Sequence, residues 1–113
     1  MYIGEAAKKS GASERAIRLY ESMGLLRVSR AGKYRVFSEA DIEFIRLIKE
    51  GQSLGLHLSE LKELVDGEQD FNWTKVLQLL EEKQQSIASQ IKMLEVQYLR
   101  IGEYRQAIDQ CNY

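Results

Sequence analysis

The chain has 113 residues, of which 44% are hydrophobic, and it carries a formal net charge of −1. This length allows one compact domain with an extension and excludes two independent hydrophobic cores. No apolar run reaches membrane-spanning length, the first residues lack the features of a signal peptide, and a single cysteine excludes an internal disulfide, so we expect a cytoplasmic protein without membrane contact.

Residues 3–22 have the spacing of a helix-turn-helix. Ala7 is a small residue suited to the point where two helices cross, and Gly11 suits a tight turn that needs a positive φ. Ile17 fills the angle between the helices, and Ser13 is a good N-cap for the second one. The pattern predicts a second helix that starts near Ser13.

This second helix is expected to present basic side chains to a partner. The positions on or beside its outward face are Arg15, Ala16 and Arg18. Ile17 and either Leu19 or Tyr20 turn toward the domain. Because an outward arginine can contact a phosphate or a guanine edge, the segment points to DNA. The alternative is a plain loop between two surface helices.

A short hairpin, or wing, is predicted next. Gly32 lies beside residues that favour strands, which is typical of a hairpin turn. The basic residues of this stretch are Arg27, Arg30, Lys33 and Arg35, and its alternating apolar residues are Tyr34, Val36 and Phe37. Such a wing commonly lies against backbone phosphates.

The charge is unevenly distributed along the chain. Residues 1–37 hold eight Lys/Arg and three Asp/Glu, residues 38–70 hold three and nine, and residues 71–113 hold five of each. The basic surplus therefore lies in the helix-turn-helix and wing, as expected of a domain that holds DNA with one face.

The remainder of the chain is predicted to be helical. Ser38 caps a helix that runs to about Ser53, and a shorter helix follows over residues 59–65. This helix stops near Asp66 and Gly67, and a polar link of Glu68, Gln69, Asp70 and Asn72 then leads to the last segment.

The last forty residues carry an apolar seam with the four-three spacing of a coiled coil. Its members are Trp73, Leu77, Leu80, Gln84, Ile87, Ile91, Leu94, Tyr98, Ile101, Arg105 and Ile108. Burying the nine apolar or aromatic members in each chain contributes on the order of 10 to 20 kcal/mol before entropy costs, which predicts a homodimer. A second apolar stripe packs against the preceding helices or lines a ligand pocket; it comprises Val76, Leu79, Met93, Val96, Leu99 and Tyr104.

Residues that could support other chemistry are few. Cys111 has no second cysteine or nearby histidine in sequence, so no metal site within one chain and no cofactor are predicted. It is either an exposed bystander or a redox sensor across a dimer, and His57 is either structural or a sensor. Because no nucleophile and base pair is evident and no phosphate-binding loop is present, we expect no enzyme activity.

Six ordered motifs resemble the MerR family of bacterial transcriptional regulators. They are Ile3–Ala7, Gly11–Ser13, Ile17–Glu21, Gly24–Leu26, Lys33–Phe37 and Leu54–Leu61. The chain departs from the family in three places: Leu19 stands where a tyrosine pair is usual, Ala16 stands where threonine is common, and the chain contains no proline.

The resemblance implies a winged helix-turn-helix DNA-binding domain with connecting helices over residues 1–70 and an antiparallel coiled-coil dimerisation helix with a short tail over residues 71–113. The DNA-binding residues it implies are Ser13, Arg15, Ala16, Arg18, Tyr20, Arg30, Lys33, Tyr34 and Arg35. The implied dimerisation residues are Leu77, Leu80, Ile87, Ile91, Leu94, Tyr98 and Ile101.

As a member of such a family, the chain would bind a pseudo-palindromic promoter, bend and untwist it, engage RNA polymerase there and respond to a small effector. The alternative is an architectural DNA-binding protein or a protein-interaction module without an effector.

Overall fold

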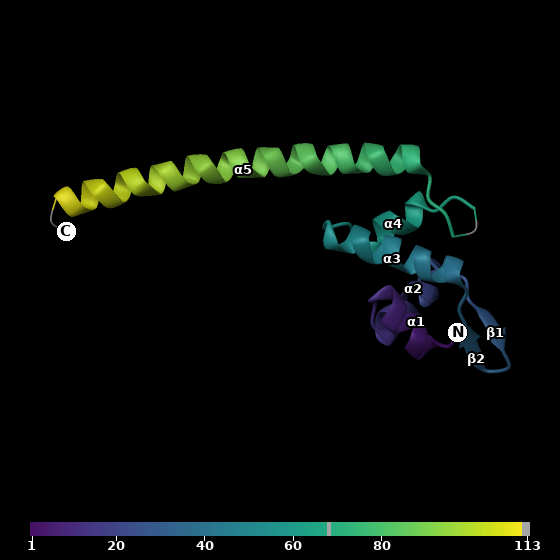
Figure 1. Cartoon of the computed structure of the whole chain (residues 1–113). Coiled ribbons are helices and arrows are strands. Elements are labelled where there is room, and N and C mark those ends of the chain that lie inside the picture. Colours follow the sequence, from purple (N-terminus) through teal and green to yellow (C-terminus); the bar gives the residue numbers. More distant parts are fainter. Residues whose placement is uncertain (68, 112–113) are drawn as a thin grey trace. The chain divides into compact units, whose positions relative to one another are not determined.

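The computed structural model describes residues 1–67 and 69–111, which divide into two compact units, the first over Met1–Trp73 and the second from Thr74 onward. The elements are α1 (Ile3–Ser10), α2 (Glu14–Ser22), β1 (Ser29–Ala31), β2 (Tyr34–Val36), α3 (Glu39–Ser53), α4 (Leu58–Leu64) and α5 (Trp73–Gln110) (Figure 1). The predicted fold is confirmed: a mostly α chain with a helix-turn-helix, a two-stranded wing, a helical pair and a long last helix.

The turn between α1 and α2 forms as its residues predict. Gly11 has a φ of 78° and its N–H donates to the Ala7 carbonyl at 2.9 Å, which ends α1. The Ser13 hydroxyl accepts from the Ala16 N–H at 3.0 Å and starts α2. The sequence places Ala7 at the helix contact, but the structure buries Ala6 completely and Ala7 only in part, because Ala6 and Ser10 form the inner face.

The wing is a β-hairpin with a two-residue turn. Its strands pair antiparallel, with Ser29 opposite Val36, Arg30 opposite Arg35 and Ala31 opposite Tyr34. Gly32 has a φ of 61° at the first turn position and Lys33 has no positive φ, which is the pattern of a type II′ turn. The hairpin therefore projects Lys33 at its tip.

α3 contributes four of the eight largest fully buried side chains of the first unit. Ser38 caps α3 as predicted and forms a capping box with Asp41, in which the Ser38 N–H donates to Asp41 Oδ2 at 2.8 Å and the Asp41 N–H donates to Ser38 Oγ at 3.1 Å. The largest fully buried side chains are Tyr20, Phe37, Phe44, Ile17, Leu26, Ile42, Ile45 and Ile48. This core fixes α2 against α3 and leaves the opposite face of α2 exposed.

The link predicted as polar is anchored on the core. Val65 bridges to Phe71, and the Phe71 ring stacks on Phe44 with a centroid distance of 5.0 Å. Gln69 donates from Nε2 to the Arg27 carbonyl at 2.8 Å and also to the Asp41 carboxylate. The Glu68 part of the predicted link lies outside the described residues. The link is thus a closed loop of the first unit.

The second unit is dominated by α5, which at 38 residues is about 57 Å long. None of its described side chains is buried. Six of the seven seam residues that the sequence assigns to dimerisation are exposed, with Leu77 at 69% and Tyr98 at 78%, and Leu80 is half-buried. The region described contains no helix that is both long and apolar enough to cross a membrane.

Candidate nucleic-acid interface

The outward face of α2 is the centre of the candidate site. At about 100° per residue, Arg18, Ser22, Arg15 and Leu19 fall within an arc of roughly 100° on the side opposite Ile17. Arg15 and Arg18 are exposed, and neither makes an ion pair within the part of the chain that the structure describes. Their guanidinium groups therefore remain available to a partner.

Ser13 and Ala16 lie at the entry to this face. The Ser13 hydroxyl is exposed but already accepts the capping hydrogen bond, and Ala16 is half-buried at the edge of the face. Both positions are close to the helix start, where backbone N–H groups favour an anion. They form the border of the outward face, and Arg15 lies nearer its centre.

Tyr20 differs from expectation. Its side chain is only 2% exposed, and its hydroxyl donates to Gln52 Oε1 at 2.6 Å. Burial raises the pKa of Tyr20 above its usual value of 10.0. The predicted contact of Tyr20 with DNA is therefore corrected. Tyr20 follows Ile17 by three residues and so lies on the same inward face of α2. Leu19, at 47% exposed, is the one of the pair that turns outward.

A single carboxylate joins the wing to α2. Glu21 Oε1 accepts from Arg35 Nε at 2.7 Å and lies 3.2 Å from Arg30 Nη2. Arg30 and Arg35 are direct cross-strand partners, and like charges in that arrangement repel. Glu21, whose side chain is 19% exposed, offsets this repulsion. In the structure both arginines therefore hold the wing in place; this bridge cannot be read from the charge pattern alone.

The tip of the wing carries an exposed aromatic and cationic cluster. The Lys33 ammonium lies 5.6 Å from the centroid of the Tyr34 ring, and the Tyr34 ring packs on Tyr2 at a centroid distance of 5.9 Å. Both tyrosines are about 60% exposed. Tyr2 reaches this place because the Met1 carbonyl accepts from the Phe37 N–H at 2.7 Å. Tyr2 was not predicted from the sequence, because its contact with Tyr34 depends on this long-range pairing.

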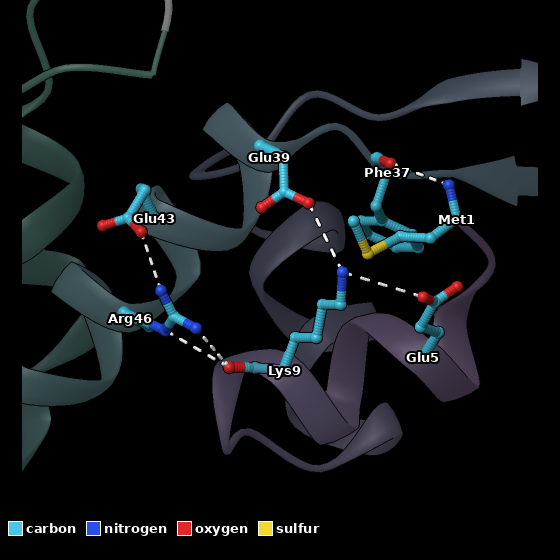
Figure 2. A network of polar contacts seen from close by, with 7 residues as sticks. All are labelled: Met1, Glu5, Lys9, Phe37, Glu39, Glu43 and Arg46. Carbon is cyan, nitrogen blue, oxygen red and sulfur yellow. Dashed lines mark hydrogen bonds and ion pairs between the residues drawn. The ribbon is translucent and has the colours of Figure 1, made fainter.

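Other charged side chains hold α1 against α3, as Figure 2 shows. Arg46 donates to the Lys9 carbonyl at 2.7 and 3.2 Å and pairs with Glu43 at 2.7 Å. The Lys49 ammonium donates to the Gly11 carbonyl. These cations lie at the C-terminal end of α1, where the helix dipole favours positive charge, and they steady the turn that leads into α2.

The eight basic residues of positions 1–37 thus divide into two groups. Lys9, Arg30 and Arg35 form ion pairs, and Arg27 also has an interaction partner. No ion pair is found in the described structure for the other four, which are Lys8, Arg15, Arg18 and Lys33. No carboxylate offsets the charge of these four in the part of the chain that the structure describes.

Among the residues that the structure places, no three His, Cys, Asp or Glu side chains gather where they could hold a metal ion. Cys111 is a free, exposed thiol near the end of the described chain.

Comparison with known families matches this chain to two models. One is described as MerR HTH family regulatory protein and matches residues 1–68, and the other is described as MerR, DNA binding and matches residues 42–104. An uncharacterised HTH-type transcriptional regulator of Pseudomonas aeruginosa is 36% identical over 102 residues, which cover 88% of this chain and 67% of that protein. The HTH-type transcriptional regulator HmrR of Sinorhizobium medicae is 40% identical over 67 residues, or 58% of this chain. The match spans about half of HmrR, 46% of its length.

Two solved structures are similar over nearly the whole chain. HiNmlR, a MerR family regulator lacking the sensor domain and bound to promoter DNA, is 27% identical with a TM-score of 0.61, covering 97% of this chain and 86% of its own. The transcription regulator PbrR691 from Ralstonia metallidurans, in complex with lead(II), has a TM-score of 0.75 over 94% of this chain and 86% of its own. At 22% identity, the second likeness supports the fold alone.

Proposed function

This chain belongs to the MerR family of DNA-binding transcriptional regulators, and we propose that it acts as a homodimer that reads a pseudo-palindromic promoter site and distorts it. The observation that carries the proposal is the outward face of α2, where Arg15 and Arg18 are exposed and make no ion pair within the described structure. The face is flanked by a wing that Glu21 holds in place.

We assign α2 to the major groove and the wing tip to the backbone. Arg15 and Arg18 can make bidentate contacts to guanine or reach phosphates, while Lys33 and Tyr34 contact flanking phosphates. Ser13 and Ala16 approach the backbone at the start of α2. Arg30 and Arg35 act first by positioning the wing, and the exposed end of Arg30, with 45% of its side chain accessible, reaches phosphate as well.

The dimer is proposed from the exposed seam of α5. The proposed dimerisation residues are Leu77, Leu80, Ile87, Ile91, Leu94, Tyr98 and Ile101, and none of them is buried within one chain. Apolar side chains at coiled-coil spacing bury this surface against a second copy. The family resemblance implies the antiparallel direction. In this organisation residues 1–70 are the DNA-binding part and residues 71–113 the dimerisation part.

A twofold dimer places two α2 helices on successive turns of the major groove and so predicts two half-sites. Deforming a DNA site that contains two half-sites costs a few kcal/mol. This is comparable to the difference in free energy with which one small effector can bind two states of the protein. We therefore include bending and untwisting, engagement of RNA polymerase at the promoter, and control by a small effector in the proposal.

The proposal is tested by a footprint of the purified protein on the DNA upstream of its own gene, followed by Arg18→Ala on the protected site. We expect protection of a pseudo-palindrome, and a loss of about 1–3 kcal/mol in specific binding for Arg18→Ala. Arg100→Ala is the matched control, because Arg100 is an exposed arginine of α5 outside the seam. Absence of protection at moderate salt, or equal affinity of the two variants, would overturn the proposed role of α2.

A further inference from the structure

Leu19 is the apolar exception on the outward face of α2. The exposed residues of this fully described helix are Glu14, Arg15, Arg18, Leu19 and Ser22, and the other four are polar or charged. Leu19 is 47% exposed, whereas Ile17 and Tyr20 on the opposite face are almost completely buried. Leu19 therefore contributes little to the core and presents an isobutyl group beside two free arginines.

The inference rests on the proposed function, in which α2 lies in the major groove. Base edges in that groove offer hydrogen-bond donors and acceptors to Arg15 and Arg18, but they offer one apolar group, the C5-methyl of thymine. An exposed leucine gains free energy by removing that methyl group from water. We propose that Leu19 packs on a thymine methyl in each half-site and so is a specificity-determining residue.

The helix geometry also predicts where this thymine lies. Leu19 follows Arg15 by four residues, which is about 6 Å along the helix axis. Base pairs are about 3.4 Å apart along the duplex. The thymine should therefore lie within about two base pairs of the base or phosphate that Arg15 contacts.

The test uses the protected site with each thymine replaced in turn by deoxyuridine, which removes only the methyl group. For the wild-type protein we expect one symmetry-related pair of thymine positions to be sensitive to removal of the methyl group. Affinity should fall about fourfold when the methyl group is removed from one half-site, and roughly tenfold or more when it is removed from both. Leu19→Ala should bind the thymine site as weakly as the wild type binds the deoxyuridine site, and should not distinguish the two bases.

Leu54→Ala is the matched control, because Leu54 is 57% exposed at the C-cap of α3 and does not belong to the outward face of α2. This variant should keep the full thymine preference. The far-ultraviolet circular dichroism of Leu19→Ala should match the wild type, because the side chain removed is on the surface.

Two results would overturn the inference: no position is sensitive to deoxyuridine in the wild type, or the same sensitivity persists in Leu19→Ala. Either result, obtained while the wild type still protects its site and Arg18→Ala still weakens binding, leaves the proposed function intact. Failure of the wild type to bind any promoter fragment would instead overturn both.

Discussion

Replacement of Glu21 with glutamine tests whether one carboxylate holds the wing on α2. The substitution keeps the size of the side chain but removes the charge that faces Arg35 Nε at 2.7 Å and Arg30 Nη2 at 3.2 Å. A hydrogen bond to a charged group contributes about 1.5–3 kcal/mol, and the exposed Arg30 end reduces this. The two arginines also lose the charge that offsets their cross-strand repulsion. We expect the free energy of unfolding in urea to fall by about 1–2 kcal/mol.

DNA binding should change in two opposite ways in Glu21→Gln. Removal of a negative charge near the interface raises the affinity for any DNA, because repulsion of phosphate is lost. Release of the wing lowers the preference for the promoter over a scrambled sequence, because Lys33 at the tip is no longer held in register. We expect this preference to fall about three- to tenfold, measured by fluorescence anisotropy on the two DNA fragments.

Glu14→Gln is the matched control, since it removes the same charge from the same helix at an exposed position with no ion pair in the structure described. It should raise affinity for any DNA, keep the promoter preference and lose only a few tenths of a kcal/mol from the helix dipole. Equal stability and equal promoter preference in the two variants would refute the reasoning that Glu21 positions the wing.

Four further outcomes follow from the geometry. Because burial raises the folded pKa of Tyr20, the folded state should lose stability as the pH rises above about 10 toward that raised pKa, and Tyr20→Phe should lose less over the same range in urea titrations. Gly11→Ala should destabilise by about 1–2 kcal/mol at a φ of 78°, whereas Gly4→Ala, in open space within α1, should stabilise by about 0.5–1 kcal/mol in thermal unfolding. In sedimentation, Leu94→Glu in the α5 seam should dissociate the proposed dimer, and Gln85→Glu outside the seam should not. Log affinity against log salt should have a slope of about −9 if Arg30 and the four cations without an ion pair neutralise phosphate in each protomer, rather than about −14 for all eight.

The elements of this fold could be predicted because their signals are local. Gly11 with Ser13 specifies the turn of the helix-turn-helix, Gly32 specifies the hairpin, and Ser38 with Asp41 specifies the start of α3. Each signal depends on backbone geometry or on a cap within three residues. A residue with a positive φ or a helix N-cap can be predicted without knowledge of the tertiary fold. The residue types at these positions were therefore sufficient to predict the turn, the hairpin and the helix start.

The closed loop before α5 was not predicted, because its contacts are long-range. The polar residues around position 70 favour a solvated link, but Phe71 returns to stack on Phe44, 27 positions earlier in the sequence. In the sequence, only the position of Phe71 within a polar run indicated that the link packs on the core. Tyr20 was closer to being predictable, since its spacing of three from Ile17 already favours the inward face; the structure places Leu19 outward and Tyr20 inward.

The arginines show why charge predicts a DNA-binding half of the chain more readily than it predicts DNA-binding residues. Arg18 and Arg35 belong to the same basic segment and look alike in sequence, but only Arg35 has a carboxylate within 2.7 Å, supplied by a different element. In the proposed function, Arg18 exchanges the hydration of its free guanidinium for contacts to DNA, so replacing Arg18 should weaken binding and leave folding unchanged. Arg35 exchanged its hydration for the contact with Glu21 when the chain folded. Replacing Arg35 should therefore affect the stability of the wing first, and DNA binding only through the wing. The neighbouring carboxylate, which tertiary structure alone reveals, decides between these two roles.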